Sequence, residues 1–171
     1  MLRKLSPKTL TDISVVKEHL KVDYTEEDSL INGYIEAAHN FVEDYTSIAI
    51  GVQDFEEYLT ADMTENFVYL SMNPIVSISE VVEIDEVTGE EVVLSDYVSI
   101  SNALGTRITT DKKKSYKVTY SAGIDLADIP KQMHQAILLV TSDMFENRIE
   151  QVKVKRTSVE YLLNQVSIKR I

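Results

Sequence analysis

The chain has 171 residues, of which 44% are apolar and 26% charged, and its formal net charge at pH 7 is −11. It contains no cysteine, which excludes disulfide frameworks and thiolate metal sites. The longest apolar run, residues 136–140, is far shorter than the roughly 20 residues that span a bilayer. The basic residues near the start are not followed by the apolar region of a secretory signal. We therefore expect a soluble intracellular protein, or one assembled in a cytoplasm, with no membrane segment and with one hydrophobic core or a core and a small satellite.

Charge is distributed unevenly along the chain. Residues 22–106 contain 19 Asp or Glu and no Lys or Arg, whereas residues 1–21 and 107–171 carry net charges of +3 and +5. Because the middle segment has no cations, its carboxylates are solvated or face the basic ends of this chain or of a neighbouring one. Such a segment is poorly suited to binding the phosphates of a DNA duplex. The alternative is an acidic surface that only maintains solubility.

Apolar spacing predicts two helices in the first third of the chain. A short helix is expected over residues 11–21, with Thr11 or Asp12 as its cap. A long helix is expected near 26–46, because Thr25-Glu-Glu-Asp28 resembles a capping box and apolar residues follow at helical spacing. Gly33 lies inside this helix, where glycine costs about 1 kcal/mol relative to alanine. It indicates either a close approach of another helix, within the chain or between subunits, or a tolerated local defect.

The helical period disappears between about 52 and 121. Short runs rich in β-branched and aromatic residues, separated by turn residues, predict a small antiparallel β meander there. The runs are Phe67–Leu70, Val81–Ile84, Glu91–Leu94, Tyr97–Ile100 and Tyr116–Tyr120.

Helical spacing returns after Pro130. It predicts a second long helix near 130–148, and the capping box Thr157-Ser-Val-Glu160 predicts a short last helix. We expect the two long helices to pack through Ile35, Ala38, Val42, Ile137, Val140 and Met144. The predicted fold class is α+β: a single domain over residues 1–171, with a mainly helical body and the meander inserted at about 52–121.

A search for catalytic motifs is negative. Glu36-Ala-Ala-His39 matches one Glu-x-x-His element of a di-iron site, but His19 and His134 have no Glu three residues before them. The five glycines form no phosphate-binding loop, dinucleotide-binding turn or nucleophile elbow. Lys112-Lys-Lys114 is expected to be a solvated turn, with a phosphate contact as the alternative. We therefore expect no catalytic residue, no metal and no cofactor.

Four blocks of the sequence, in chain order, resemble the head-tail connector proteins of long-tailed phages and prophages, also called head-completion or portal-adaptor proteins. The blocks are Leu20–Asp28 with the helix after it, Pro74–Val81, Val118–Gly123 with the stretch Ile129–Arg148, and Ser158–Leu163. The chain departs from the usual pattern at its end, where Val166-Ser-Ile-Lys-Arg170 replaces a Tyr-Arg-like tail.

The resemblance implies a structural virion protein rather than an enzyme. Such proteins form a cyclic ring of roughly a dozen subunits beneath the portal vertex. The ring extends the DNA channel after packaging and offers a docking surface for the tail or the next head-completion protein. The implied partners are the portal protein, the tail-side protein and further copies of this chain, while DNA passes without specific binding and no membrane is involved. The implied location is the virion head–tail junction, after assembly in the cytoplasm of a bacterial host.

Two surfaces are candidate sites under this interpretation. Residues 151–171 are expected to leave the globular body as an arm that docks on the portal or the adjacent subunit through Lys153, Lys155, Arg156, Lys169 and Arg170. The acidic segment is expected to face the channel lumen or the tail-side rim through Glu83, Asp85, Glu86, Glu90 and Glu91, or to lie outside and only maintain solubility. Two other function classes remain as alternatives: an acidic regulatory protein that mimics nucleic acid, and a small metal-binding enzyme.

Overall fold

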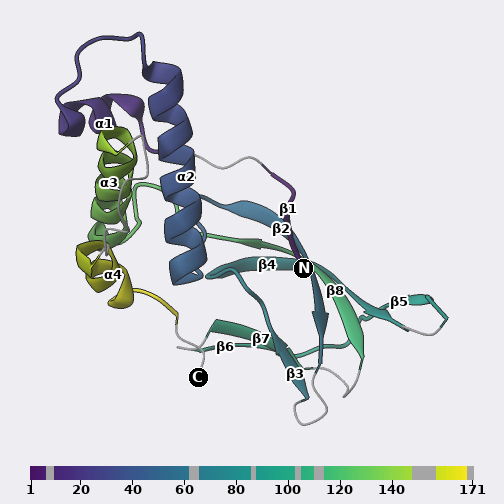
Figure 1. Cartoon of the computed structure of the whole chain (residues 1–171). Coiled ribbons are helices and arrows are strands. Elements are labelled where there is room, and N and C mark those ends of the chain that lie inside the picture. The colour runs from purple at the N-terminus through teal and green to yellow at the C-terminus, as the bar shows by residue number, and fades with distance from the viewer. Residues whose placement is uncertain are drawn as a thin grey trace. The chain divides into compact units, whose positions relative to one another are not determined.

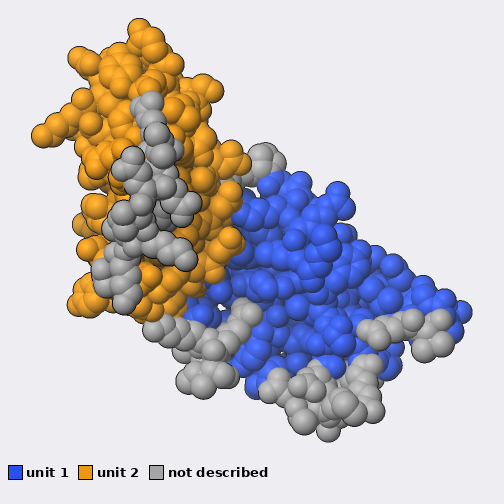
Figure 2. All heavy atoms as spheres, viewed as in Figure 1, with its two compact units in different colours: residues 1–8, 47–124, 168–171 blue, residues 9–46, 125–167 orange. Residues whose placement is uncertain are grey.

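The computed structural model describes residues 1–6, 10–61, 66–85, 88–102, 105–109, 114–147 and 157–168. The chain divides into two compact units, coloured separately in Figure 2. Residues 1–8, 47–124 and 168–171 form the β unit, and residues 9–46 and 125–167 form the helical unit. In the described part of the chain, none of the helices combines the length and the apolar character that a membrane crossing requires.

The described residues of the helical unit form four helices (Figure 1). The bounds of the first three lie within two residues of those predicted, and the last begins at the predicted capping box. The helices are α1 (Ile13–Leu20), α2 (Asp28–Thr46), α3 (Lys131–Glu146) and α4 (Thr157–Asn164). Asp12 is the N-cap of α1, since its side chain accepts a hydrogen bond from the Ser14 amide at 2.7 Å. Lys21 ends the helix in the left-handed conformation, with φ at 57°.

Helices α2 and α3 pack against each other through the residues that the sequence predicts. Ile35, Ala38 and Val42 of α2 are fully buried, as are Ile137 and Val140 of α3, and Met144 is half-buried. A second cluster ties α1 to this pair through four buried side chains: Val16, Ile31, Ile35 and Leu138.

The β unit consists of two antiparallel sheets. The larger sheet has the order β1-β2-β8-β4-β5, and the smaller has the order β3-β7-β6. The strands of the larger sheet are β1 (Leu2–Lys4), β2 (Gln53–Thr60), β8 (Ser115–Ala122), β4 (Ile75–Ile84) and β5 (Glu91–Val93). Those of the smaller sheet are β3 (Phe67–Tyr69), β7 (Gly105–Thr109) and β6 (Ser99–Asn102).

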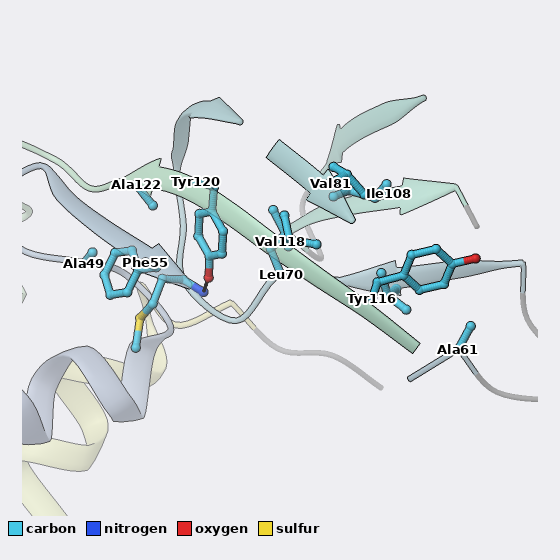
Figure 3. Close-up of a cluster of buried hydrophobic side chains, with 12 residues drawn as sticks. Ala49, Phe55, Ala61, Leu70, Val81, Ile108, Tyr116, Val118, Tyr120 and Ala122 are labelled. Atoms are coloured by element: carbon cyan, nitrogen blue, oxygen red, sulfur yellow. Dashed lines mark hydrogen bonds between the residues drawn. The ribbon is translucent and has the colours of Figure 1, made fainter. Parts of the chain in front are cut away.

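Alternate residues of the central strand β8 fill the core of the β unit. Tyr116, Val118 and Tyr120 are buried, while the residues between them are half-buried. Phe55 of β2 stacks on Tyr120 with ring centroids 5.5 Å apart, and Ile108 of β7 joins the same cluster from the smaller sheet (Figure 3). The core therefore joins the two sheets.

The predicted α+β class is confirmed, but the expectation of a mainly helical body built on long helices is wrong. In the described residues, eight strands form a compact unit of their own, and α2 and α3 have ordinary lengths of 19 and 16 residues. The strands do not form a simple meander either, because β8 lies between β2 and β4. Three of the described strands were not predicted from the sequence: β1, β2 and β7.

A buried charge explains why β2 was missed. Its inward positions are Gln53, Phe55, Glu57 and Leu59, so two of the four side chains that face the core are polar. The alternation of apolar and polar residues that identifies a strand is therefore absent. In β7, Gly105 begins the strand and resembles a turn residue, and β1 is only three residues long.

Candidate functional site

The hairpin of β4 and β5 brings together four of the five predicted acidic residues. Ile84 lies opposite Glu91 in the register, and the Asp85 amide donates a hydrogen bond to the Glu90 carbonyl at 3.0 Å. Asp85, Glu90 and Glu91 are exposed and Glu83 is half-buried. We call these four residues the acidic hairpin. The fifth predicted residue, Glu86, lies outside the described residues.

Lys117 of β8, and Lys114 directly before that strand, partly neutralise the acidic hairpin. Lys114 Nζ lies 2.6 Å from a Glu83 carboxylate oxygen, and Lys117 Nζ lies 2.8 Å from a Glu91 carboxylate oxygen. The hydrogen bond with Glu91 raises the pKa of the Lys117 ammonium above its usual value. The surface is therefore mixed in charge at the base of the hairpin. Lys114, which the sequence placed in a solvated turn, is bound to a carboxylate instead.

Two further ion pairs lie outside the acidic hairpin. Arg3 lies 3.9 Å from Glu56, and Lys17 lies 2.7 Å from Asp28. In each of these pairs, and in the two of the acidic hairpin, the carboxylate belongs to residues 22–106 and the cation lies outside that segment. Of the alternatives that the sequence leaves open for the acidic segment, these four carboxylates face the basic ends of their own chain.

A buried carboxylate holds the loop that leads into β4. Glu57 is only 3% exposed, and its Oε2 accepts hydrogen bonds from the Ser71 amide and from Tyr120 Oη, both at 2.9 Å. The Ser71 hydroxyl donates a hydrogen bond to the other carboxylate oxygen of Glu57, Oε1. Tyr120 Oη also accepts from the Met72 amide at 3.3 Å. A carboxylate with this many donors tolerates burial.

Asn73 ties the same loop to the smaller sheet. Its Oδ1 accepts from the Thr106 amide at 3.0 Å, and the Leu70 amide donates to the Thr106 carbonyl at 2.9 Å. The peptide bond from Asn73 to Pro74 is cis, and β4 begins at the next residue. The network of Glu57, Tyr120 and Asn73 thus fixes where β4, and with it the acidic hairpin, leaves the core. The polar groups of this network hydrogen-bond to one another, so the role of the network is structural.

Gly123 closes the sheet at the other end of β8. Its φ is +137°, and a Cβ there would lie 2.1 Å from the Gly51 carbonyl oxygen. The Gly123 amide donates to the Pro74 carbonyl at 2.9 Å, and the Ile124 amide donates to the Ala49 carbonyl at 3.1 Å. Only glycine fits where these backbones approach so closely.

The two ends of the Glu36-Ala-Ala-His39 match have different surroundings. Glu36 is exposed on α2, whereas His39 is fully buried, and the Thr11 amide donates to His39 Nε2 at 3.2 Å. Within the described ranges, no group of three or more His, Asp or Glu side chains could hold a metal ion. Gly33 does not mark a close approach within the chain, since no described neighbour comes within 4 Å of the position of a Cβ.

Residues 151–171 were expected to leave the globular body as an arm, and this is wrong for the residues of α4. Helix α4 packs against α3, with Val159 and Leu163 buried, so residues 157–164 belong to the helical unit and do not leave it. The apolar face behind the predicted capping box requires such burial. The five basic residues proposed for docking lie outside the described residues: Lys153, Lys155, Arg156, Lys169 and Arg170.

Comparison with known proteins gives a family and a fold. Residues 10–104 match the family model described as "Phage gp6-like head-tail connector protein". No curated protein sequence matches the chain. The fold is similar to that of chains in two solved structures, "Virion of native gene transfer agent (GTA) particle" (TM-score 0.81, 19% identity) and "Neck of empty GTA particle computed with C6 symmetry" (TM-score 0.80, 19% identity).

A third structure, "Neck of native GTA particle computed with C12 symmetry", gives a TM-score of 0.76 at 18% identity. Each of the three matches covers 100% of this chain and 97% of the other. The family model covers more than half of the chain. The chain therefore belongs to the phage gp6-like head-tail connector family, whose members are structural virion proteins rather than enzymes.

Proposed function

We propose that this protein forms a cyclic ring beneath the portal vertex of a phage or phage-like particle, at the junction of head and tail. The observation that carries the proposal is the family match over residues 10–104. The likeness in fold, over the whole chain, to proteins from particle necks with C6 and C12 symmetry supports it. A ring of one protein needs a heterologous contact, in which two different surfaces of each subunit meet.

Residues 1–171 act in this proposal as one connector module, made of the β unit and the helical unit. The ring extends the DNA channel and presents a docking surface to the tail or to the next head-completion protein. The module assembles in the cytoplasm of the bacterial host. DNA passes through the ring without specific contacts, as suits a surface rich in carboxylates.

Docking on the portal or the adjacent subunit is assigned to the basic residues around α4, namely Lys153, Lys155, Arg156, Lys169 and Arg170. Their charge favours an acidic partner surface, and α4, packed on α3, anchors the segment between them. The acidic hairpin is assigned to the lumen or to the tail-side rim, where carboxylates repel the DNA duplex and keep it centred.

Two variants test the docking assignment without removing α4. One replaces Lys153, Lys155 and Arg156 by Ser, and the other ends the chain after Ile168. Both are expected to fold, as judged by circular dichroism, but to bind portal-containing heads at least tenfold less than the unchanged protein in sedimentation assays. Lys131→Ser serves as the control, because Lys131 is an exposed cation on α3. Normal binding by both variants would contradict the docking assignment.

A further inference from the structure

The smaller sheet of the β unit has one face in the core and one face outside it. Residues that lie opposite each other in an antiparallel pair point to the same face, and the face alternates along each strand. Ile108 lies opposite Val68, and both are buried, so this row of the sheet belongs to the core. The rows on either side of it point the other way. They form a surface that we call the sheet face: Phe67 and Tyr69 of β3, Arg107 and Thr109 of β7, Ile100 of β6, and Val98 directly before β6.

The sheet face has the composition of a protein–protein interface. Val98 and Ile100 are exposed, and the three larger side chains beside them are half-buried. The rings of Phe67 and Tyr69 meet edge to face with centroids 5.3 Å apart, and the Arg107 guanidinium carbon lies 4.6 Å from the Phe67 centroid. Aromatic residues and arginine are enriched where proteins bind one another. Because these three side chains already contact one another, a partner has little left to order.

Arg107 determines what kind of partner fits the sheet face. It is the only charged residue of the six, and in the described part of the chain it contacts the Phe67 ring and makes no ion pair. Burying a guanidinium against apolar groups is costly unless a carboxylate pairs with it. A nucleic acid fits poorly, because residues 22–106 contain no Lys or Arg that could neutralise its phosphates. The partner is therefore a protein surface that combines exposed apolar side chains with a carboxylate.

The chain carries such a surface where α1 is followed by α2. Residues 22–30 contain four carboxylates and no Lys or Arg. Tyr24 and Leu30 are exposed there, and Glu27 connects them: the Tyr24 hydroxyl donates to Glu27 Oε2 at 2.8 Å, and Leu30 lies three residues further along. Asp23 is exposed, and within the described chain no ion pair or hydrogen bond engages its carboxylate. We call these four residues, Asp23, Tyr24, Glu27 and Leu30, the helical corner.

We propose that the sheet face of one subunit binds the helical corner of the next subunit in the ring, with Arg107 paired to Asp23. The exposed apolar side chains of the two surfaces are buried in the same contact. The sheet face belongs to the β unit and the helical corner to the helical unit, so two different surfaces meet, as a ring of one protein needs. The inference rests on the proposed ring and names the contact that forms it.

The charges favour this contact over one between two sheet faces. None of the six residues of the sheet face is acidic, so a second sheet face would offer Arg107 no carboxylate. In the proposed contact each subunit offers its sheet face to one neighbour and its helical corner to the other. Subunits therefore add head to tail until the ring closes.

Mixtures of two charge-reversal variants test the pairing of Arg107 with Asp23. R107E has an altered sheet face and an unchanged helical corner, and D23R has the reverse. Each variant alone should form rings on portal-containing heads at least about tenfold less often than the unchanged protein, because like charges meet in every contact. An equal mixture should restore the rings, because the two kinds of subunit alternate and every contact then joins a carboxylate to a guanidinium.

Electron microscopy counts the heads that carry rings, and sedimentation equilibrium measures self-association of the protein in solution. K131E and E36R are the control pair, since they reverse charges at exposed positions of α3 and α2 outside both surfaces. Rings of the unchanged protein that the mixture fails to restore would overturn the contact and leave the proposed function standing. Recovery by R107E/D23R but not by the mixture would mean that the two surfaces meet within one chain, which also overturns the contact.

Self-association in solution that follows the predicted pattern, while heads remain without rings, would support the contact and contradict the proposed function. An unchanged protein that associates neither in solution nor on heads would contradict both.

An apolar position provides a second test that leaves Arg107 in place. V98D adds a carboxylate to the sheet face, where it meets the acidic helical corner, so ring formation should fall at least about tenfold. V76D is the matched control, because Val76 on β4 is 58% exposed, as Val98 is, and lies outside the sheet face. It should form rings as often as the unchanged protein. Equal losses in the two variants, or none in V98D, would overturn the assignment of the sheet face.

Discussion

At the scale of single residues, Glu57 explains much of how the β unit is built. Its carboxylate is buried, and its donors come from the loop before β4 and from the middle of β8. A charge in that place is stable only while those donors remain. The stability of the β unit is therefore sensitive to small changes in the partners of Glu57.

Replacing Tyr120 by Phe should lower the free energy of unfolding by about 1–3 kcal/mol, because it removes one donor from the buried carboxylate and one acceptor from the Met72 amide. Urea denaturation measures the change. Tyr58→Phe is the matched control, since Tyr58 on β2 is 44% exposed, and it should change stability by less than about 0.5 kcal/mol. Equal effects of the two variants would mean that the network does not stabilise the fold.

Gly123→Ala should destabilise the β unit much more than Gly89→Ala. Both glycines have positive φ, but a Cβ at Gly123 meets the Gly51 backbone, whereas none of the described atoms lies within 4 Å of a Cβ at Gly89. Gly89→Ala should therefore cost about 1 kcal/mol from backbone strain alone. Thermal unfolding followed by circular dichroism compares the two, and a similar loss in both would refute a role for the close approach.

At the scale of elements, the packing of α2 on α3 carries the helical unit. Ile137 is fully buried in this contact, so Ile137→Ala should cost about 2–5 kcal/mol of unfolding free energy. Gln135→Ala, at an exposed position of the same helix, is the control. A loss below about 0.5 kcal/mol for Ile137→Ala would contradict this packing.

The cap of α1 should make its stability depend on pH. The hydrogen bonds from Ser14 lower the pKa of the Asp12 carboxyl below its ordinary value of 3.8. A pKa lowered by folding contributes stability above the ordinary value, and that contribution is lost as the pH falls through the lowered value. Asp12→Asn keeps an acceptor that does not titrate, so it should flatten the stability curve on the acid side of the ordinary carboxyl pKa of 3.8. An unchanged curve would rule out this contribution.

The sequence predicts the helices far better than the sheets, for a physical reason. A helix such as α2 shows its buried face through apolar residues at regular spacing, and both capping motifs lie close to the real helix starts. The strands depend on long-range pairing, and the buried Glu57 in β2 hides the alternation that would reveal it.

The candidate sites show the same division. The grouping of Glu83, Asp85, Glu90 and Glu91 follows from a hairpin that the sequence indicates. Their pairing with Lys114 and Lys117 depends on β8 lying beside β4, and that neighbourhood is a matter of sheet topology, which local patterns do not encode. The network around Tyr120 was missed for the same reason.

At the scale of the whole molecule, the acidic hairpin should influence the passage of DNA. Glu90→Lys should slow DNA ejection from otherwise normal particles, because a cation at the lumen or rim attracts phosphates that the carboxylate repels. Glu36→Lys makes the same charge change at an exposed position of α2 and should leave ejection unchanged. Equal ejection rates in both variants, with lower solubility for Glu90→Lys, would place the acidic hairpin on the outside.

In the proposed function, many copies of this chain form a ring at the portal vertex. Electron microscopy of the protein mixed with portal-containing heads tests it most directly. We expect a ring of density with cyclic symmetry attached beneath the portal, present only when the protein is added. Heads that remain bare at the vertex, or protein bound elsewhere on the head, would show that the chain does not form this ring.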